Sequence, residues 1–413
     1  MLDGLLAAGA VFAGVFSGGF ALFSAACARQ ALRPRGRRGP EVDELPPVTV
    51  LKPLKGRDRG LYHNLASFCG QDYPRFQIVF ALSDPDDPAA EVIAELKKDF
   101  PGVDMEVVVS SGRIGCNPKI NNLANAYHRV KHGTLVIADS DIRVRPDFLR
   151  TAVRPLSDPR VGIVTCFYRA CGAKGLWGLM EELAINAHFL PQALAAAAMG
   201  IKFAMGAAIV VRRRAFEATG GFKNLADHIA DDFVLGRAVQ AAGYRLAFAE
   251  AVVDVICEVG SYADHIQHQI REQRVIRLCK PSEYCGMALL HGFSFLTLRM
   301  AVVGPDALGL GLLAGLWAAK AASIAWIQDR VLDGRASLRS LWLLPLSEWT
   351  AFAAWVFGFG YNRVSWRGVS YAIHPNGKLT PVRPSLAVRQ GPVVPGGAGR
   401  PPLAEGGVRA LSP

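Results

Sequence analysis

Two closely spaced acids, Asp139 and Asp141, are the side chains of this sequence best suited to bind a metal ion. They follow the apolar run 134–138 directly, so they stand at the carboxyl end of a predicted strand. Carboxylate oxygens at this spacing can share one divalent cation, Mg²⁺ or Mn²⁺, which can in turn hold a diphosphate. In isolation the same spacing is equally typical of an acidic turn, so the neighbouring elements decide the interpretation.

A second acidic segment, 83–88, follows the apolar run 77–82. Its three acids repel one another unless their charge is compensated by a cation, or by a donor-rich ligand such as a uracil ring with its ribose. We therefore choose Asp84 for contact with a nucleoside. The alternative is a turn that caps a helix beginning at residue 89.

The segment 115–123 lies between these two acidic segments in the sequence. Asn117 followed by Pro118 is the pattern of a helix N-cap and first helical residue. Lys119 then lies near a helix N-terminus, a position that favours phosphate. The alternative is an ordinary helix start with a solvated lysine.

An acidic pair, Asp231 and Asp232, opens a further predicted helix after the glycine turn at 220–222. A carboxylate at this place can act as a general base that removes the proton of an attacking hydroxyl. We choose Asp232 for this role and keep Asp231 as the alternative. The interpretation without chemistry is that both acids interact favourably with the helix dipole.

Three arginines, Arg271, Arg274 and Arg277, form a basic stripe on a predicted helix. Such a stripe can clamp a diphosphate leaving group, because guanidinium groups bind phosphate oxygens in pairs. It can equally bind lipid phosphates ahead of the apolar segment 284–303.

The elements that position these residues alternate between short β-rich runs and helical stretches. The predicted strands are 48–51, 77–82, 105–109 and 135–139, and the predicted helices are 61–68, 89–99 and 119–130. This alternation predicts the α/β class, with a mostly parallel, Rossmann-like sheet covered by helices on both faces over residues 47–282. Ligands of such sheets bind at the carboxyl ends of the strands.

The hydrophobic content of 51% and mean hydropathy of +0.21 indicate that this domain is joined to membrane segments. Residues 1–28 are predicted to be a transmembrane anchor, with a cleaved signal peptide as the alternative. Residues 29–46 form a linker that begins with several arginines. By the positive-inside rule these arginines place the catalytic domain in the cytoplasm, in a bacterial-type inner membrane.

A C-terminal membrane region is predicted over 283–361. The runs 307–327 and 341–361 are predicted spans, whereas 284–303 is expected to be interfacial or re-entrant. Residues 362–413 form a tail, expected to be disordered from about 389 because Gly and Pro dominate its end.

The formal charge of +11 fits nucleic acid, an anionic membrane or a phosphate-bearing substrate. Because the arginine clusters flank membrane segments, lipid headgroups and substrate phosphate are favoured, and nucleic acid is not an expected partner. The eight cysteines show no spacing typical of a zinc site, and we expect them to be reduced.

These motifs, in this order, resemble the inverting GT-A glycosyltransferases, and most closely the ceramide glucosyltransferase family. The resemblance covers about residues 47–282, and NPKINNL (117–123) is its most specific segment. The other matching segments are LKPLKG (51–56), DYP (72–74), SDPDDPA (83–89), ADSDIRV (138–144), GGF (220–222) and IADDF (229–233).

The resemblance implies that Asp84 binds the uridine, that Asp139 lies near the diphosphate and metal, and that Asp232 is the catalytic base. Further substrate contacts are expected at Lys52, Lys119, Arg271 and Arg274, and metal contacts at Asp139 and Asp141. The family's closing motif is Arg or Gln, two residues, then Arg-Trp. Here it is matched from His268 with Glu272 at the Trp position, or from Arg274 with Leu278 there.

The implied function is a multi-pass membrane enzyme that transfers a hexose from a UDP-sugar to a lipid hydroxyl with inversion, as ceramide glucosyltransferases do. Segments 61–74 and 226–232 resemble the bacterial hopanoid glycosyltransferases equally well, so a hopanoid N-acetylglucosaminyltransferase is the alternative. Glu272 motivates an alternative of another class, a non-catalytic lipid-binding scaffold that retains the fold. A polysaccharide synthase ranks lower because it needs more spanning segments.

Overall fold

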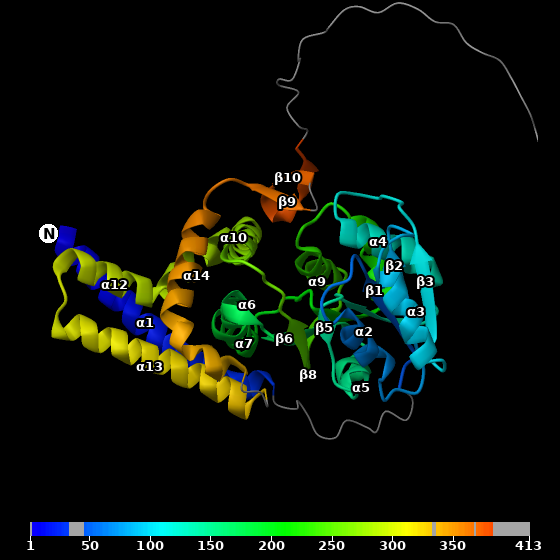
Figure 1. The fold of residues 1–413 in the computed structure, drawn as a ribbon, viewed down its shortest axis with the longest axis horizontal. Coiled ribbons are helices and arrows are strands. Elements are labelled where there is room, and N and C mark those ends of the chain that lie inside the picture. Colours follow the sequence, from blue (N-terminus) through cyan, green and yellow to red (C-terminus); the bar gives the residue numbers. More distant parts are fainter. Residues whose placement is uncertain (1, 33–44, 333–335, 367–368, 383–413) are drawn as a thin grey trace, which may run out of the picture.

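The computed structural model describes residues 2–32, 45–332, 336–366 and 369–382. Most of the predicted linker 29–46, and the part of the tail expected to be disordered from 389, therefore lie outside the described residues. Figure 1 shows a sheet with its helices on one side and the helices α1, α12 and α13 on the other, with α6, α7 and α14 between them.

An eight-stranded sheet with the order β3-β2-β1-β4-β7-β6-β8-β5 is the centre of the fold. Its parallel half consists of β3 (Asp104–Val109), β2 (Phe76–Leu82), β1 (Val48–Pro53) and β4 (Thr134–Ala138). The central strands β1 and β4 are buried almost throughout, which is why their sequences read as unbroken apolar runs. All four predicted strands are confirmed to within a residue or two.

The other half of the sheet is mixed. β7 (Ala208–Arg212) is antiparallel to both β4 and β6 (Val161–Cys171), and β8 (Arg245–Ile256) is parallel to β6 and antiparallel to the short β5 (Ile142–Arg143). The sheet is thus mostly parallel with an antiparallel insertion. The prediction of a parallel α/β sheet is confirmed, whereas the reversal at β7 was not predicted.

Helices cover both faces of the sheet, as predicted. α2 (Leu61–Cys69), α3 (Ala89–Asp99) and α5 (Phe148–Val153) pack into one buried apolar cluster with the sheet. α4 (Pro118–Ala126), α8 (Arg213–Ala218) and α9 (Asp231–Ala241) pack into a second cluster. The alternation of residues along β1 explains the two cores, because Val48 and Val50 enter the first and Leu51 enters the second.

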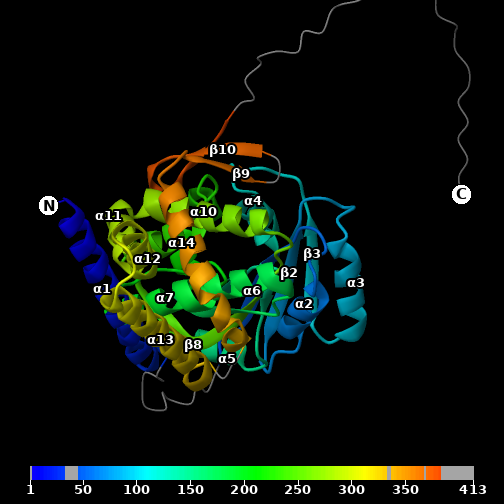
Figure 2. The same cartoon turned by 60° about the vertical axis from the view of Figure 1, so that its left-hand side comes forward.

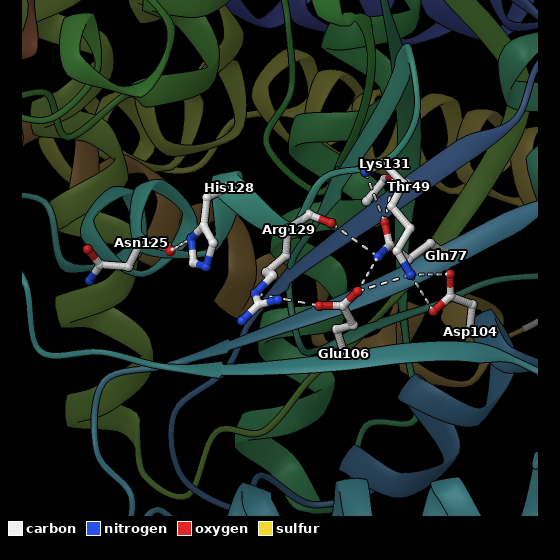
Figure 3. A network of polar contacts seen from close by, with 8 residues as sticks. All are labelled: Thr49, Gln77, Asp104, Glu106, Asn125, His128, Arg129 and Lys131. Atoms are coloured by element: carbon white, nitrogen blue, oxygen red, sulfur yellow. Dashed lines mark hydrogen bonds and ion pairs between the residues drawn. The ribbon is translucent and has the colours of Figure 1, made fainter.

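A polar network holds the amino ends of β1, β2 and β3 together (Figure 3). The Lys131 ammonium lies 2.8 Å from Asp104 Oδ2 and 3.0 Å from Glu106 Oε1. The Gln77 amide accepts from Thr49 Oγ1 at 3.0 Å and donates to Glu106 Oε1 at 3.2 Å. These contacts lie at the opposite edge from the carboxyl ends of the strands, which leaves those ends to bind a ligand.

Between β6 and β7 the chain leaves the sheet and forms α6 (Gly175–Leu183), a π-helical turn, η3 (Ala184–Phe189), and α7 (Leu190–Ala198). These helices lie between the sheet and α1 and α13 in Figures 1 and 2. α10 (Tyr262–Cys279) follows β8 and leads to the C-terminal helices.

Two of the described helices are long and apolar enough to cross a membrane. Within α1 (Leu2–Ala31) the candidate span is Leu6–Ala31, and within α13 (Ala307–Arg330) it is Ala307–Asp329. Segments Pro281–Leu290 and Gly292–Val303, which contain α11 (Pro281–Gly286), η5 (Met287–Leu290) and α12 (Gly292–Val303), form a pair bent by 58°. A bend of this size fits either one broken span or a re-entrant loop, so the expectation that 284–303 is interfacial or re-entrant stays a prediction.

The predicted span at 341–361 has a different structure. It begins in the 3₁₀ segment η6 (Ala336–Leu343) and continues as α14 (Leu344–Gly358), which has 15 residues. A helix of this length is shorter than the ~20 residues that cross a bilayer. Pro345 at the start of α14 prevents the two segments from joining, because proline cannot continue the preceding helix.

The tail contains a small sheet that the sequence did not predict. β9 (Arg363–Trp366), β10 (Val369–Ile373) and β11 (Leu379–Pro381) pair antiparallel in the order β11-β10-β9. Buried side chains of this sheet pack on Cys116, Ile229 and Leu278 of the α/β domain. The C-terminal segment up to residue 382 therefore belongs to the same body as the large sheet.

Candidate active site

The carboxyl ends of β1, β2 and β4 form one edge of the sheet, and this is the edge at which the sequence predicts the active site. β1 is hydrogen-bonded to β2 on one side and to β4 on the other, with all three strands parallel. Lys52 lies in β1, Asp84 follows β2, and Asp139 and Asp141 follow β4. The expected meeting of these segments at one edge is confirmed.

Lys119 joins this edge to the start of α9. Its ammonium lies 2.7 Å from Asp139 Oδ1 and 3.6 Å from Asp231 Oδ2. Burial alone would lower the pKa of Lys119, but these two carboxylates raise it above its ordinary value. A permanently charged lysine thus lies between two acids from different elements, at the N-terminus of α4.

Asn117 fixes this arrangement from the loop before α4. Its side-chain oxygen accepts from the backbone N–H groups of Lys119 at 2.9 Å and Ile120 at 3.2 Å, so the predicted N-cap is confirmed. Its amide nitrogen donates to the His228 carbonyl at 2.8 Å and to Asp231 Oδ1 at 3.4 Å. One side chain therefore caps α4 and also holds the loop that leads into α9.

Gly115 lets these two loops approach each other. A Cβ at this position would lie 2.5 Å from the Ala226 carbonyl oxygen, closer than any side chain allows. The Asn117 N–H donates to the same carbonyl at 2.8 Å, and the Cys116 N–H donates to Asp227 Oδ1 at 2.9 Å. The close packing of the two loops thus depends on glycine at 115, and the backbone N–H groups of the next two residues hold the loops together.

Lys52 is fully buried beneath the site. Its ammonium donates to the Asp139 carbonyl at 2.7 Å and lies 3.6 Å from the centre of the Phe68 ring. Burial lowers the pKa of Lys52 to about 7, although Asp139 and Asp141 oppose this change. Lys52 therefore contacts the backbone that carries the acids.

Asp141 has an oxygen that the described residues leave unsatisfied. Its Oδ1 atom is buried and has no hydrogen-bond partner among them. Burial and the charge of Asp139 raise the pKa of Asp141 to about 6. A buried carboxylate oxygen without a partner is costly, so a positive ligand at this place would stabilise it.

Asp231 and Asp232 form the first turn of α9, as predicted. Burial raises the pKa of Asp232 to about 7, and the neighbouring charge of Asp231 adds to this effect. Asp232 Oδ2 lies 3.2 Å from the place that a Cβ on Gly206 would occupy, so glycine at 206 leaves room for this carboxylate. Asp231 has Lys119 and Asn117 as partners, which leaves Asp232 as the better proton acceptor.

The acids of the segment after β2 have different roles. Asp87 is buried and accepts from the Gly56 N–H at 2.9 and 3.0 Å and from the Ala89 N–H at 2.9 Å. It thus connects the loop after β1 to the start of α3, a role that the sequence did not assign. Asp84 is exposed, and among the described contacts its carboxylate accepts only from the Asp86 N–H at 3.0 Å, which leaves this carboxylate open to a ligand.

The three arginines of the α10 stripe likewise differ in their contacts. Arg271 pairs with its neighbour Glu272 at 2.9 Å, and both side chains are partly exposed. Arg274 donates to the Arg363 carbonyl at 3.0 Å, and Arg277 donates to the Gly358 carbonyl at 2.8 Å. Two of the three arginines therefore bind the segment that connects α14 to β9, and Arg271 is the one whose guanidinium makes no described contact with another element.

The first half of α10 is held by a buried acid on α6. Glu181 accepts from His265 Nδ1 and His268 Nδ1, both at 2.6 Å, and lies within 3.4 Å of the Gln269 amide. These hydrogen bonds outweigh burial and lower the pKa of Glu181 to about 2. His268, the first residue of the predicted closing motif, is thus a structural partner of α6.

The family model described as glycosyl transferase family 21 matches residues 11–379 of this chain. The chain belongs to glycosyl transferase family 21. The match includes α1, the α/β domain, the C-terminal helices and most of the small sheet, so these segments form one family unit.

The family 21 chain is similar to ceramide glucosyltransferases over part of its length. It is 29% identical to ceramide glucosyltransferase 3 of Caenorhabditis elegans over 210 residues, which cover 51% of this chain and 46% of that protein. It is 35% identical to a ceramide glucosyltransferase of Candida albicans over 123 residues, 27% of this chain and 22% of that protein. The chain thus spans about half or less of these relatives.

The fold of the family 21 chain is GT-A. A mannosyltransferase from Pyrobaculum calidifontis, solved with GDP-Man and Mn²⁺, is 20% identical in sequence and superposes with a TM-score of 0.50. The match covers 86% of this chain and 97% of that structure. This similarity extends to the fold, and the predicted GT-A class is confirmed.

Some site residues of the family 21 chain were not predicted, namely Gly206, Gly115, Asp87 and Glu181. A glycine just ahead of a buried strand, as at Gly206 two residues before β7, is a signal for close approach of the backbone. Glu181 gave no signal, because its partners lie more than eighty residues away. Within the ranges that the structure describes, no group of three or more His, Cys, Asp or Glu side chains is placed to hold a metal ion.

Proposed function

We propose that this chain is a membrane-bound, inverting glycosyltransferase that moves glucose from UDP-glucose to the primary hydroxyl of ceramide. The observation that supports this most strongly is the position of Asp232. Asp232 is a carboxylate with a pKa of about 7 in the first turn of α9. Its neighbour Asp231 pairs with Lys119, which connects α9 to the carboxyl ends of the strands. The family 21 match and the similarity to ceramide glucosyltransferases support the substrate class.

In the proposed reaction Asp232 accepts the proton of the lipid hydroxyl, and the hydroxyl oxygen forms a bond to the anomeric carbon of the sugar. The bond from that carbon to the UDP oxygen breaks, and its electron pair leaves with UDP. Attack from the face opposite UDP gives inversion. The proton on Asp232 then passes to solvent, so the products are glycolipid, UDP and one proton.

Asp84, exposed after β2, is placed in this proposal against the uridine, and Arg271 against the leaving diphosphate. Lys119 binds phosphate at the N-terminus of α4, where backbone N–H groups also favour anions. Lys52 and Asn117 contribute by holding the Asp139 carbonyl and the loop before α9. These two residues position the site and make no transfer themselves.

The residues present fit a divalent cation at Asp139 and Asp141. The unsatisfied Oδ1 of Asp141 is an oxygen ligand without a partner, and two carboxylates with diphosphate oxygens make the set that Mg²⁺ or Mn²⁺ prefers. When bound, the cation would neutralise negative charge that develops on the departing UDP. The similar mannosyltransferase structure contains Mn²⁺.

The decisive experiment gives detergent-solubilised full-length protein UDP-glucose or UDP-N-acetylglucosamine, each with ceramide or a hopanoid polyol, with and without Mg²⁺ or Mn²⁺. Mass spectrometry detects the glycolipid. We expect glucosylceramide, formed only with a divalent cation. N-acetylglucosaminyl hopanoid as the sole product would replace the proposed donor and acceptor, and no product with any pair would favour the lipid-binding scaffold.

The matched control is Asp232→Asn, which keeps the shape of the side chain. We expect it to bind UDP as the wild type does and to lose turnover by about 10²–10⁴-fold, the usual contribution of a general base. Turnover close to wild type would remove Asp232 from this role, and Asp231→Asn would then be tested in its place.

A further inference from the structure

A small polar cavity lies between the α/β domain and the membrane helices. Its volume is about 40 Å³, enough for a polar group of a few atoms. α1, η3 with α7, and α13 contribute its walls. The polar side chains that line it are Ser17, Ser24, His188, Gln192, Lys320 and Ser323.

A buried ion pair stands beside this cavity. The Lys320 ammonium lies 2.6 Å from Glu348 Oε1, and the two side chains are only 13% and 2% exposed. His188 lies 3.8 Å from the same carboxylate and 2.9 Å from Ser347 Oγ. Lys320 belongs to a candidate membrane span, and charged residues at such depth are costly and commonly mark a binding site or pathway.

The cluster has hydrogen-bonding capacity that the described residues do not use. Glu348 Oε2 and His291 Nε2 are buried and have no partner among them. Lys320 has three N–H donors and spends two of them, on Glu348 and on the Leu290 carbonyl. Glu348 and His291 do not line the cavity, but the serine hydroxyls, the Gln192 amide and Lys320 do, so the lining can both donate and accept hydrogen bonds. Lys320 and Glu348 cancel each other's charge. An uncharged group with hydroxyl or amide functions matches this lining, whereas a phosphate would be repelled by Glu348.

A short chain of contacts links the cavity to the catalytic carboxylates. His188 is followed by Phe189, whose ring stacks on Tyr168 of β6 at 4.8 Å. Burial raises the pKa of Tyr168, and the charges of Glu272, Asp232, Asp141 and Asp139 raise it further, so these acids lie within electrostatic reach of that ring. The Tyr168–Phe189 pair therefore lies on a path of contacts between His188, which lines the cavity, and the strand that feels these carboxylates.

We propose that this cavity binds the uncharged, hydroxyl- or amide-bearing head of the acceptor lipid, with Lys320, His188 and Gln192 as its recognition residues and Glu348 as the acid that holds Lys320 in place. The proposal rests on the proposed lipid glycosylation and adds the place and the chemistry of acceptor selection. An acceptor that leaves the bilayer beside α1 and α13 reaches this cluster before the catalytic edge. Neutral lipids are selected and anionic phospholipids are rejected.

The test uses the double variant Lys320→Met/Glu348→Gln, which removes both charges and leaves neither one unpaired. Binding of fluorescent short-chain ceramide to the detergent-solubilised full chain is measured alongside binding of UDP. A hopanoid polyol and phosphatidylglycerol serve as competitors. We expect the double variant to bind ceramide at least tenfold more weakly with UDP affinity unchanged, and the wild type to ignore phosphatidylglycerol.

The matched control is Arg299→Met/Asp306→Asn, which removes another ion pair of the membrane region, one whose guanidinium and carboxylate do not line the cavity. It should leave ceramide binding unchanged. If the Lys320/Glu348 variant does not fold, Gln192→Leu changes a lining side chain without touching the ion pair and should weaken binding in the same way.

Unchanged ceramide affinity in folded variants would overturn the inference and leave a structural ion pair only. Competition by phosphatidylglycerol as strong as by the neutral lipids would overturn it as well. Failure of the proposed function has a different signature, because a wild-type protein that binds ceramide at this cavity but transfers no sugar from any donor refutes the enzyme and not the site.

Discussion

At the scale of single residues, the environment of Asp232 determines the pH at which the proposed reaction runs. Burial and Asp231 raise its pKa to about 7, and a general base must be deprotonated to accept a proton. We expect kcat/KM to rise about tenfold per pH unit below 7 and to level off above it. A pH–rate profile that is flat from pH 5 to 8 would contradict this assignment.

Glu272 offers a finer test of the same site. Its negative charge is one of the causes that raise the pKa of Asp232, so Glu272→Gln should move the midpoint of the pH–rate profile to lower pH. Glu91→Gln, an exposed acid of α3 paired with Arg57, is the control and should leave the midpoint unchanged. Equal profiles for all three proteins would place Glu272 out of electrostatic reach of the base.

A comparison of Lys119 with Lys131 measures how much the ion pairs of the site stabilise the folded protein. Each lysine contacts two carboxylates, but Lys119 is only 17% exposed and Lys131 is 48% exposed. Removing one partner of a buried cluster costs about 3–5 kcal/mol, whereas surface pairs contribute about 0–1 kcal/mol. Lys119→Met should therefore lower the melting temperature of the apo protein far more than Lys131→Met, in thermal denaturation at pH 8. Equal shifts would show that solvent screens the Lys119 cluster.

The residues that could be predicted from the sequence are those whose function follows from local position. Asn117, Lys119, Asp139 and Asp231 each stand at a strand end or a helix start, and these ends meet because parallel strands share one edge. The contact of Arg274 could not be predicted, because its partner, the Arg363 carbonyl, belongs to a short strand whose residues show no recognisable strand pattern.

At the scale of elements, the small sheet of β9, β10 and β11 supports the loop that precedes Asp232, the proposed base. The Ile229 N–H donates to the Gly377 carbonyl at 2.9 Å, and the Leu379 N–H donates to the Asp227 carbonyl at 2.6 Å. The loop that precedes Asp231 and Asp232 is thus held from one side by Asn117 and from the other by the C-terminal sheet. These strands were not predicted because they are too short to show a clear strand pattern within the expected tail.

Gly377 tests this support. It has a φ of +76°, and a Cβ there would lie 3.2 Å from Cys279 Sγ and 3.5 Å from Ile229 Cγ2. Gly377→Val should therefore displace the 227–229 loop, reduce turnover at least tenfold and speed hydrogen exchange at residues 227–232. Gly243→Ala, with a φ of +89° and open space around it, carries the backbone strain alone and should retain turnover. Normal exchange in folded Gly377→Val would show that the loop is independent of the sheet.

At the scale of the whole molecule, the membrane helices and the small sheet together define a topology. α1 and α13 run side by side with α12, and Figures 1 and 2 show α12 extending away from the sheet and α13 returning toward it. The bent pair and α13 therefore form a hairpin beside α1. The short α14 need not cross the membrane, and the small sheet that follows it lies against the α/β domain, so the chain after α13 stays on the side of that domain.

The resulting prediction concerns the two ends of the described chain. Residue 382 should lie on the same side of the membrane as the α/β domain, and the N-terminus before α1 on the other side. This follows if α1 crosses once and the hairpin crosses twice, which counts the bent pair as one broken span and replaces the interfacial or re-entrant segment expected from the sequence. Arg29 in the last turn of α1 favours the cytoplasmic side for the domain. Epitope tags before α1, in the loop after α3 and after residue 382 can be probed with protease in sealed inverted vesicles. We expect digestion of the last two tags and protection of the first. Protection of the tag after residue 382 with digestion in the α3 loop would place the C-terminal sheet and the α/β domain on opposite sides of the membrane. The sheet could then not support the Asp232 loop, and the effect expected for Gly377→Val would have no basis.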